Sequence, residues 1–316
     1  MGLLLAVALV LWVGLDAMLA SIRRVRPGDV AVYLALTGGT YLLRALRFRS
    51  LIGLDVSLPK LYGIVSLHTL MVNLLPFSAG DLAYPVLLKR YRISRTLIDS
   101  VPSLVLVRIQ DLVITGALLM VAVAWLGRGR ETVELAGSAL PGLGGPVIVA
   151  ILAAAVLGRT VARTALARRL APALRRIWLA VRDVDTRVWL ATMAVGVMIR
   201  LIATISVSYL FSSVGIELSL PTVLLITTLY TLLPLLPANV VAGIGITEAY
   251  LVACFVATGI DRTVAVAASV QIHGLQLLTA GLLAGAGFVQ LRYLGTREVS
   301  TMPAVAQAGR AAPRRR

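Results

Sequence analysis

Long apolar segments alternate with clusters of basic residues along this chain, and their lengths predict membrane-spanning helices. Residues 112–126 and 146–157, for example, contain no charged side chain. A helix of about 20 apolar residues crosses a hydrocarbon layer roughly 30 Å thick. The pattern predicts six spanning helices, at residues 3–20, 29–48, 98–126, 140–158, 188–213 and 262–291.

Two further apolar segments, residues 59–91 and 220–258, are each broken by a proline and by glycines. The breaks are Pro76 and Gly80 in the first segment, and Pro237, Gly243 and Gly245 in the second. The stretch after the first break is too short to cross a bilayer, because seven helical residues rise only about 10 Å. We therefore expect two re-entrant helical hairpins, whose non-helical tips are buried in protein or line a wet cavity.

The two broken segments belong to an internal repeat. Residues 53–59 read Gly-Leu-Asp-Val-Ser-Leu-Pro, and residues 215–221 read Gly-Ile-Glu-Leu-Ser-Leu-Pro. An acidic residue follows the glycine break in each copy, Asp81 in the first and Glu248 in the second. Repeats with broken hydrophobic segments at matching positions are typical of transporters. We expect repeat one at about 29–126 and repeat two at about 188–291.

The composition places the chain among membrane proteins. Of its 316 residues, 59% are hydrophobic and 14% are charged, and the mean hydropathy of +0.93 is too high for a soluble globular domain. The net charge of +16 does not indicate nucleic acid binding, because the arginines gather at the ends of apolar segments, where they anchor helices and meet anionic headgroups. We expect an all-α, polytopic membrane domain at 1–294, followed by a disordered basic tail at 295–316.

The arginine distribution also predicts the orientation in the cytoplasmic membrane. Short loops rich in Lys and Arg remain on the cytoplasmic side. With the amino terminus inside, the basic linker at 159–187 and both termini are cytoplasmic, and the loop at 127–138 is external. Repeat one then starts from outside and repeat two from inside, so the repeats are inverted.

Asp81 and Glu248 are the leading candidates for a functional site. A carboxylate at membrane depth costs roughly 2.5 kcal/mol or more on insertion scales, so its presence indicates a function. The alternative is a helix cap, because an acid just after a glycine break can accept hydrogen bonds from the free amides of the next helix.

Polar residues on the predicted spanning helices extend this candidate site. Arg108 and Asp111 lie on one helix face and are spaced to form a local ion pair, whose alternative role is to fix helix packing. His273 and Gln276 have the same spacing in repeat two, so the polar face persists while its charge changes. Arg200 has no close acidic neighbour in sequence, and its expected partner is a phosphate or a hairpin carboxylate.

Other polar residues have simpler interpretations. Arg44 and Arg47 lie near the inner end of a predicted helix, where snorkelling to the interface explains them. His68 and His273 are too isolated for a metal site, and the single cysteine, Cys254, excludes an intrachain disulfide. Motifs for nucleotide binding or for a hydrolase nucleophile are absent. We therefore expect a transporter rather than an enzyme, with neither metal nor cofactor.

Three sequence motifs resemble those of a known family. They are Asn-Leu-Leu-Pro-Phe-Ser-Ala-Gly-Asp at 73–81, Arg-Ile-Gln-Asp at 108–111, and Leu-Pro at 236–237 followed by Gly-Ile-Gly-Ile-Thr-Glu at 243–248. In order and spacing they resemble the flippase-like membrane family, which includes the transmembrane region of bacterial lysylphosphatidylglycerol synthases. The resemblance, over residues 1–292, implies a polytopic domain that moves or presents a lipid with a polar headgroup. Asp81 and Tyr84 stand where that family usually has glutamate and a basic residue. We expect no soluble aminoacyl-transfer domain after the arginine-rich tail, and therefore no lysyl-lipid synthesis.

We therefore expect a flippase for a lipid with a phosphate-bearing, anionic headgroup. Arg108, Arg200 and His273 would hold the phosphate, while Asp81 and Glu248 would balance charge or take up a proton. The alternative is the membrane subunit of a polyprenyl-phosphate or phospholipid glycosyl or aminoacyl transferase, whose partner would be a separate transferase. A third interpretation is a passive assembly partner, for which neutralising Asp81 and Glu248 has no effect.

Overall fold

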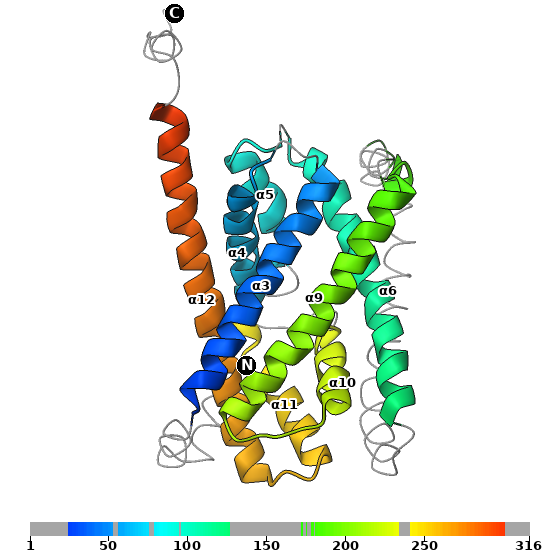
Figure 1. The fold of residues 1–316 in the computed structure, drawn as a ribbon, viewed down its shortest axis with the longest axis vertical. Coiled ribbons are helices and arrows are strands. Elements are labelled where there is room, and N and C mark those ends of the chain that lie inside the picture. The colour runs from blue at the N-terminus through cyan, green and yellow to red at the C-terminus, as the bar shows by residue number, and fades with distance from the viewer. Residues whose placement is uncertain are drawn as a thin grey trace, which may run out of the picture.

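Helices account for every regular element in the residues that the computed structural model describes. Those residues are 25–52, 56–75, 79–94, 96–126, 181–233 and 241–300, with isolated positions between 172 and 179. The helices are α3 (Pro27–Ile52), α4 (Leu58–Leu74), α5 (Ala83–Arg90), α6 (Val101–Leu126), α9 (Thr186–Ser213), α10 (Leu220–Tyr230), α11 (Ile246–Ala257) and α12 (Arg262–Ser300). Short 3-10 turns are η1 (Ala79–Leu82), η2 (Ile98–Ser100) and η4 (Val241–Gly243). The all-α fold class is confirmed (Figure 1).

Three of the described helices are long and apolar enough to cross a membrane. They are α6, α9 and the part of α12 between Arg262 and Leu294, and they coincide with three predicted spans. Helix α3 matches the predicted helix at 29–48 but carries arginines in its last turns. The predicted helices at 3–20 and 140–158, and most of the basic linker at 159–187, lie outside the described residues.

Aspartate caps fix the starts of two long helices. The Asp185 carboxylate accepts a hydrogen bond from the Arg187 amide at 2.7 Å at the start of α9, and Asp261 accepts from the Thr263 amide at 2.8 Å at the start of α12. The far end of α12 corrects the prediction, because the helix continues to Ser300 instead of ending at residue 291. Residues 295–300, which we expected to belong to the tail, continue α12. The first proline that can break this helix comes only at Pro303.

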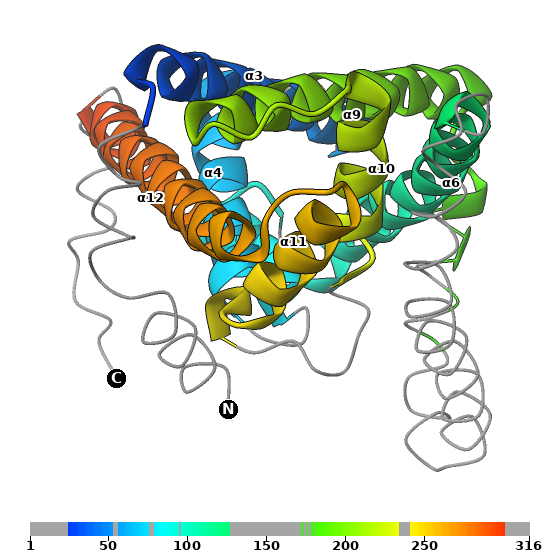
Figure 2. The ribbon, with the colours of Figure 1, turned by 90° about the horizontal axis from the view of Figure 1, so that it is seen from below.

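Helices α3 and α9 lie side by side and run in opposite directions (Figures 1 and 2). A short polar contact joins their middles, where the hydroxyls of Thr37 and Ser206 are 3.0 Å apart. The Ser206 hydroxyl also contacts the Tyr33 carbonyl oxygen at 3.1 Å. This helix pair forms one side of the molecule, with α12 beyond one end and α6 beyond the other (Figure 2).

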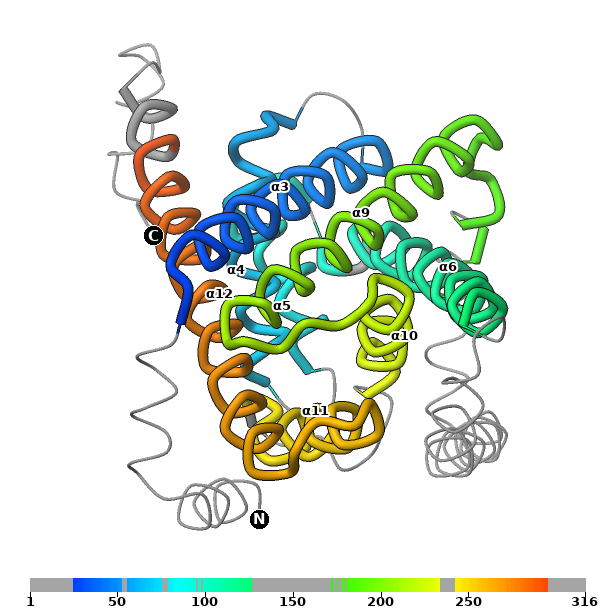
Figure 3. Tube along the Cα trace, turned by 60° about the horizontal axis from the view of Figure 1, so that its bottom comes forward, coloured from blue at the N-terminus to red at the C-terminus, as the bar shows by residue number. Residues whose placement is uncertain are grey.

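Glycines allow α4 and α12 to cross closely. A Cβ atom on Gly63 of α4 would lie 2.8 Å from the Gly287 carbonyl oxygen and 2.7 Å from Leu291 Cγ on α12. These distances are too short for any larger side chain, so the two backbones touch through glycine. Helix α10 packs against α6 in the other half of the molecule (Figure 3).

Each predicted hairpin segment is interrupted in the structure. After α4, the chain turns back through η1 into α5, and a Cβ on Gly80 would lie 2.3 Å from Val72 Cα and 2.5 Å from the Met71 carbonyl oxygen. The turn therefore packs directly on the backbone of α4. Tyr84 of the returning α5 stacks on Phe48 of α3, with ring centres 4.3 Å apart. Residues 76–78 and 234–240, which include both break prolines, lie outside the described residues.

Candidate functional site

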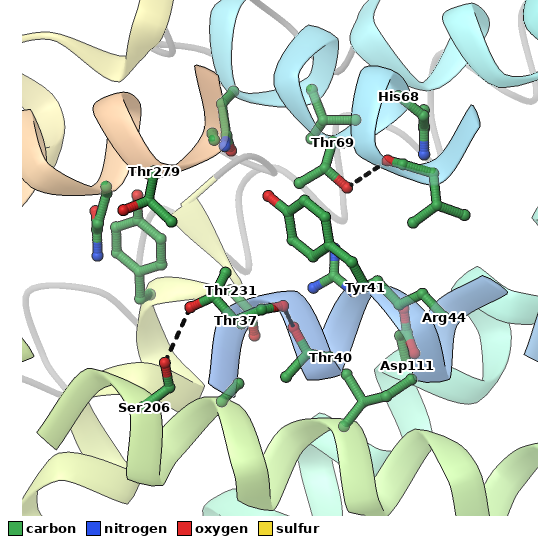
Figure 4. Close-up of a pocket in the computed structure, with 18 of the residues that line it drawn as sticks. Thr37, Thr40, Tyr41, Arg44, His68, Thr69, Asp111, Ser206, Thr231 and Thr279 are labelled. Carbon is green, nitrogen blue, oxygen red and sulfur yellow. Dashed lines mark hydrogen bonds between the residues drawn. The ribbon is translucent and has the colours of Figure 1, made fainter. Parts of the chain in front are cut away.

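A cavity of about 380 Å³ lies at the centre of the molecule, between helices of both predicted repeats. Residues of α3, α4, α6, α9, α10, α11, α12 and η4 line it, and Figure 4 shows part of this lining. Four arginine side chains reach the cavity: Arg44 and Arg47 from α3, Arg108 from α6 and Arg200 from α9. Asp111 is the one carboxylate among the described lining residues.

Arg108 forms an ion pair with Asp81, not with Asp111. Its Nε donates to Asp81 Oδ2 at 3.1 Å and its Nη2 donates to the other carboxylate oxygen. His68 Nε2 on α4 lies 3.5 Å from the same carboxylate. The predicted local pair between Arg108 and Asp111 is therefore wrong. The hairpin acid instead binds the planar guanidinium through both of its oxygens, an arrangement that is strong and geometrically specific.

Arg47, not Arg108, forms the ion pair with Asp111. Its Nη1 donates to Asp111 Oδ1 at 2.6 Å and its Nη2 donates to Gln110 Oε1 at 2.9 Å. Arg47 is only 4% exposed, so the interpretation as a snorkelling residue is wrong. The Gln110 amide in turn donates to Thr192 Oγ1 at 2.9 Å and to the Trp189 carbonyl oxygen at 3.2 Å. One buried polar network therefore links α3, α6 and α9.

Gly196 of α9 makes room for this network. A Cβ at that position would lie 3.1 Å from Arg47 Cζ and 2.6 Å from Ile114 Cδ1. The guanidinium lies against the bare backbone of α9. In the sequence, the adjacent Gln110 and Asp111 were the available sign of an arginine-binding pair, but nothing identified Arg47 as their donor.

Glu248 has two partners at once. Its Oε2 accepts a hydrogen bond from the Gly245 amide at 2.6 Å, closing the first turn of α11, and its Oε1 lies 2.7 Å from His273 Nδ1 on α12. Gly243 and Gly245, at φ +65° and +90°, adopt the left-handed backbone that the preceding turn needs. The cap that was the alternative interpretation is therefore present in the structure, together with a contact to the next long helix.

The two acids occupy corresponding places in the two sequence copies. Asp81 follows the first break and binds Arg108 of α6, while Glu248 follows the second break and contacts His273 of α12. Neither acid is among the described lining residues of the cavity, although Arg108 and His273 are. The acids thus lie behind the lining and hold side chains that reach it.

Arg44 and Arg200 carry positive charge into the cavity, and within the described part of the chain neither is paired with a carboxylate. Arg200 Nη2 donates to Thr115 Oγ1 at 3.4 Å, and none of the ion pairs formed within the described residues involves Arg200, so the predicted hairpin carboxylate is not its partner. The Arg44 guanidinium carbon lies 5.8 Å from the centre of the Tyr41 ring. Sequence reasoning identified Arg200 but passed over Arg44 as an interfacial residue.

Apolar side chains such as Leu104 and Ile199 line the rest of the cavity, together with hydroxyl and amide groups. These polar groups include Thr37, Thr40, Thr69, Thr231, Thr279 and Gln276, and Figure 4 shows the five threonines around the open space. Within the described residues, no group of three His, Cys, Asp or Glu side chains is placed to hold a metal ion. The cavity therefore offers cationic and hydroxyl groups to an occupant.

Comparison with known proteins places this arrangement in a family. Neither a curated protein nor a solved structure matches the chain. The model of the lysylphosphatidylglycerol synthase transmembrane region matches residues 1–285, which is most of the chain. The predicted resemblance is confirmed, and the chain belongs to the family of the lysylphosphatidylglycerol synthase transmembrane region.

Proposed function

We propose that this protein moves a lipid with a phosphate-bearing headgroup across the cytoplasmic membrane through the central cavity. The observation that carries the proposal is the charge of the lining: four arginines face one carboxylate among the described residues. That carboxylate, Asp111, already neutralises Arg47 at 2.6 Å. The uncompensated positive charge would attract an anion, and a phosphate 4 Å from one guanidinium gains about 4 kcal/mol at an effective dielectric constant of 20.

An inverted repeat is the architecture we propose for this movement, and the helix directions support it. Helices α3 and α9, which begin the two predicted repeats, run in opposite directions, and so do α6 and α12, which end them (Figure 1). The contacts between the two repeats follow the same symmetry. Helix α4 of repeat one packs on α12 of repeat two, and α10 of repeat two packs on α6 of repeat one. Two halves of opposite orientation around one site form the arrangement in which transporters alternate access.

The broken segments fit re-entrant hairpins that approach the cavity from opposite sides. Helix α5 has 8 residues and α11 has 12, which correspond to lengths of about 12 Å and 18 Å, too short to cross a bilayer. Helices α4 and α5 lie in the upper half of Figure 1, whereas α10 and α11 lie in the lower half. Each hairpin would then cover the cavity from one face of the membrane.

A sequence of contacts for the headgroup follows from these pairs. Arg44 and Arg200 would meet the phosphate first, because neither is held by a carboxylate. Arg108, whose side chain is 46% exposed, would exchange its contact with Asp81 for one with the phosphate. Glu248 would hold His273 in the corresponding position of repeat two. Asp81 would thus release and recapture Arg108 as the headgroup passes, while Glu248 keeps His273 in place.

Reconstitution into lipid vesicles tests this function. Acyl-labelled fluorescent phosphatidylglycerol would be incorporated into proteoliposomes, and dithionite would bleach only the label that reaches the outer leaflet. The assay would run with and without an imposed pH or voltage gradient. We expect the protein to accelerate bleaching of the inner pool relative to protein-free vesicles. Folded protein that gives the protein-free rate under every gradient would refute the proposal.

The paired acids provide the variant arm of this experiment. Asp81→Asn and Glu248→Gln are each expected to slow transfer, and the double change to be less than additive because both act on one step. The exposed acid Glu217, 72% exposed by its side chain, supplies the control Glu217→Gln. Parental rates in both site variants would reduce the acids to helix caps.

A further inference from the structure

We propose that the headgroup carried by this cavity is a phosphate joined to a neutral polyol, such as glycerol, inositol or a sugar, and that a headgroup bearing a free ammonium is excluded. This inference rests on the proposed function and narrows its substrate. It follows from the engagement of the carboxylates, the placement of the unpaired arginines and the hydroxyl groups of the lining.

The carboxylates near the cavity are already engaged by the protein. Asp111 binds Arg47 at 2.6 Å, Asp81 binds Arg108, and Glu248 lies 2.7 Å from His273 and 2.6 Å from the Gly245 amide. The break segments outside the described residues, 76–78 and 234–240, contain no Asp or Glu in their sequence. Among the described residues, an ammonium group entering the cavity therefore finds no free carboxylate to replace its water, and burying an unpaired charge is strongly unfavourable.

The unpaired arginines oppose an ammonium directly. Arg44 and Arg200 both line the cavity and form no ion pair within the described residues. Like charges repel most strongly where water is excluded. The same two guanidinium groups attract the phosphate, so the cavity separates anionic headgroups from those with an added positive charge.

Threonine hydroxyls supply hydrogen-bond acceptors for a neutral polyol. Thr69 donates its hydroxyl hydrogen to the Val65 carbonyl at 2.9 Å, and Thr231 donates to the Thr228 carbonyl at 2.7 Å. With its hydrogen used on the backbone, each oxygen keeps lone pairs that can accept a hydrogen bond from a ligand hydroxyl. Both residues line the cavity, together with Thr279 (Figure 4).

Each repeat contributes one lining arginine that forms no ion pair within the described residues, Arg44 from repeat one and Arg200 from repeat two. Repeat one contributes Arg108 and Asp111 to the lining, and repeat two has His273 and Gln276 at the same spacing. The amide of Gln276 has both donor and acceptor atoms, which suits a polyol. A phosphate beside Arg44 and Arg200 and a polyol beside Gln276 would use groups of both repeats.

A headgroup panel in the vesicle assay tests the substrate class. Acyl-labelled phosphatidylglycerol, phosphatidylinositol and a glycosyl phosphoryl polyprenol would be compared with lysyl-phosphatidylglycerol. We expect at least one polyol lipid to move about tenfold faster than the lysyl lipid, since a tenfold ratio corresponds to a difference of only about 1.4 kcal/mol. The three polyol arms distinguish a glycerolipid from a polyprenol source.

Gln276→Glu is the variant that inverts this selectivity. It places an unpaired carboxylate in the cavity with almost no change of shape, so we expect the lysyl lipid to gain and the phosphatidylglycerol rate to fall. A purely structural role for Gln276 would lower both rates together. Such a parallel loss would contradict the proposal.

Thr231→Val removes one acceptor, and the chain offers a closely matched control. The control is Thr258, which follows the last turn of α11 as Thr231 follows that of α10. Each hydroxyl donates to the carbonyl oxygen three residues earlier at 2.7 Å. Thr231 lines the cavity, and Thr258 does not. Thr231→Val should slow the polyol lipids more than Thr258→Val does. If the parent protein moves the lysyl lipid as fast as the polyol lipids, the inference is refuted and the proposed function remains. If it moves none of the lipids, the proposed function itself is refuted.

Discussion

Breaking the buried ion pair between Arg47 and Asp111 on one side should cost more stability than removing both partners. The side chain of Arg47 is 4% exposed and that of Asp111 is 25% exposed. Asp111→Leu therefore leaves the Arg47 guanidinium buried away from water, whereas Arg47→Met leaves the Asp111 carboxylate partly hydrated. Removing one partner of a buried pair typically costs about 3–5 kcal/mol. We expect about 3 kcal/mol for Asp111→Leu and about 2 kcal/mol for Arg47→Met, the lower value reflecting hydration of the stranded acid.

The double variant carries no stranded charge. Apolar replacement of a whole buried pair is often neutral, although here Gln110 also loses the guanidinium that it accepts from. A lost buried hydrogen bond costs about 1–3 kcal/mol, and Gln110 keeps its hydrogen bonds to α9, so we expect the low end, about 1 kcal/mol, for the double variant. The single losses sum to about 5 kcal/mol, so the double loss lies about 4 kcal/mol below the additive value, and this difference is the coupling energy.

Reversible unfolding by SDS from mixed micelles, followed by tryptophan fluorescence, measures this cycle. The exposed pair of Arg26 and Glu217, with a 3.4 Å contact and side chains 59% and 72% exposed, serves as a control cycle with Arg26→Gln and Glu217→Gln. Its coupling should stay below about 1 kcal/mol. Additive losses at Arg47 and Asp111 would refute the assignment of this pair as one buried unit.

Two further predictions address the hairpin turn and the orientation. Gly80→Ala would place a Cβ 2.3 Å from the α4 backbone, so it should lower the free energy of unfolding by at least about 2 kcal/mol through overpacking. The control Gly116→Ala, whose Cβ would have nothing within 4 Å, should be neutral or stabilising. Equal unfolding curves for the two variants would contradict the packed turn. In a Cys254→Ala background, an impermeant thiol reagent should label Thr263→Cys from outside and Leu97→Cys only after permeabilisation, because the basic helix ends face the cytoplasm. Labelling of Leu97→Cys in intact cells would reverse the orientation.

The sequence predicted the helices well where local signals agree. The uncharged run at 188–199 marks the start of α9, and the structure begins that helix at Thr186, two residues from the predicted position, where Asp185 caps it. The end of α12 was placed early because loss of apolar character was taken as loss of helix. Backbone hydrogen bonds need no apolar side chain, so a helix can leave the membrane and continue.

Of the six candidate site residues, four line the cavity: Arg108, Asp111, Arg200 and His273. Each of these is a polar residue within an apolar helix, which is visible in sequence. The leading candidates, Asp81 and Glu248, are not among the lining residues. The partners in the ion pairs could not be predicted from the sequence. Arg108 and Asp81 come from different elements, and the packing of the helices decides which acid an arginine reaches. Arg47 was misinterpreted for the same reason, because its burial depends on Gly196 of a helix far along the chain.

Transfer of phosphatidylglycerol by a cavity variant tests the central claim most directly. Arg44→Gln with Arg200→Gln removes the two lining charges that no carboxylate neutralises, and Arg90→Gln with Arg182→Gln removes two charges outside the lining. Each lost contact at 8 Å is worth about 2 kcal/mol at an effective dielectric constant of 20. We therefore predict that the dithionite assay shows at least a tenfold slower rate for the cavity variant and a parental rate for the control. Equal rates for the cavity variant and the parent, at matched amounts of folded protein, would contradict transport through the arginine-lined cavity.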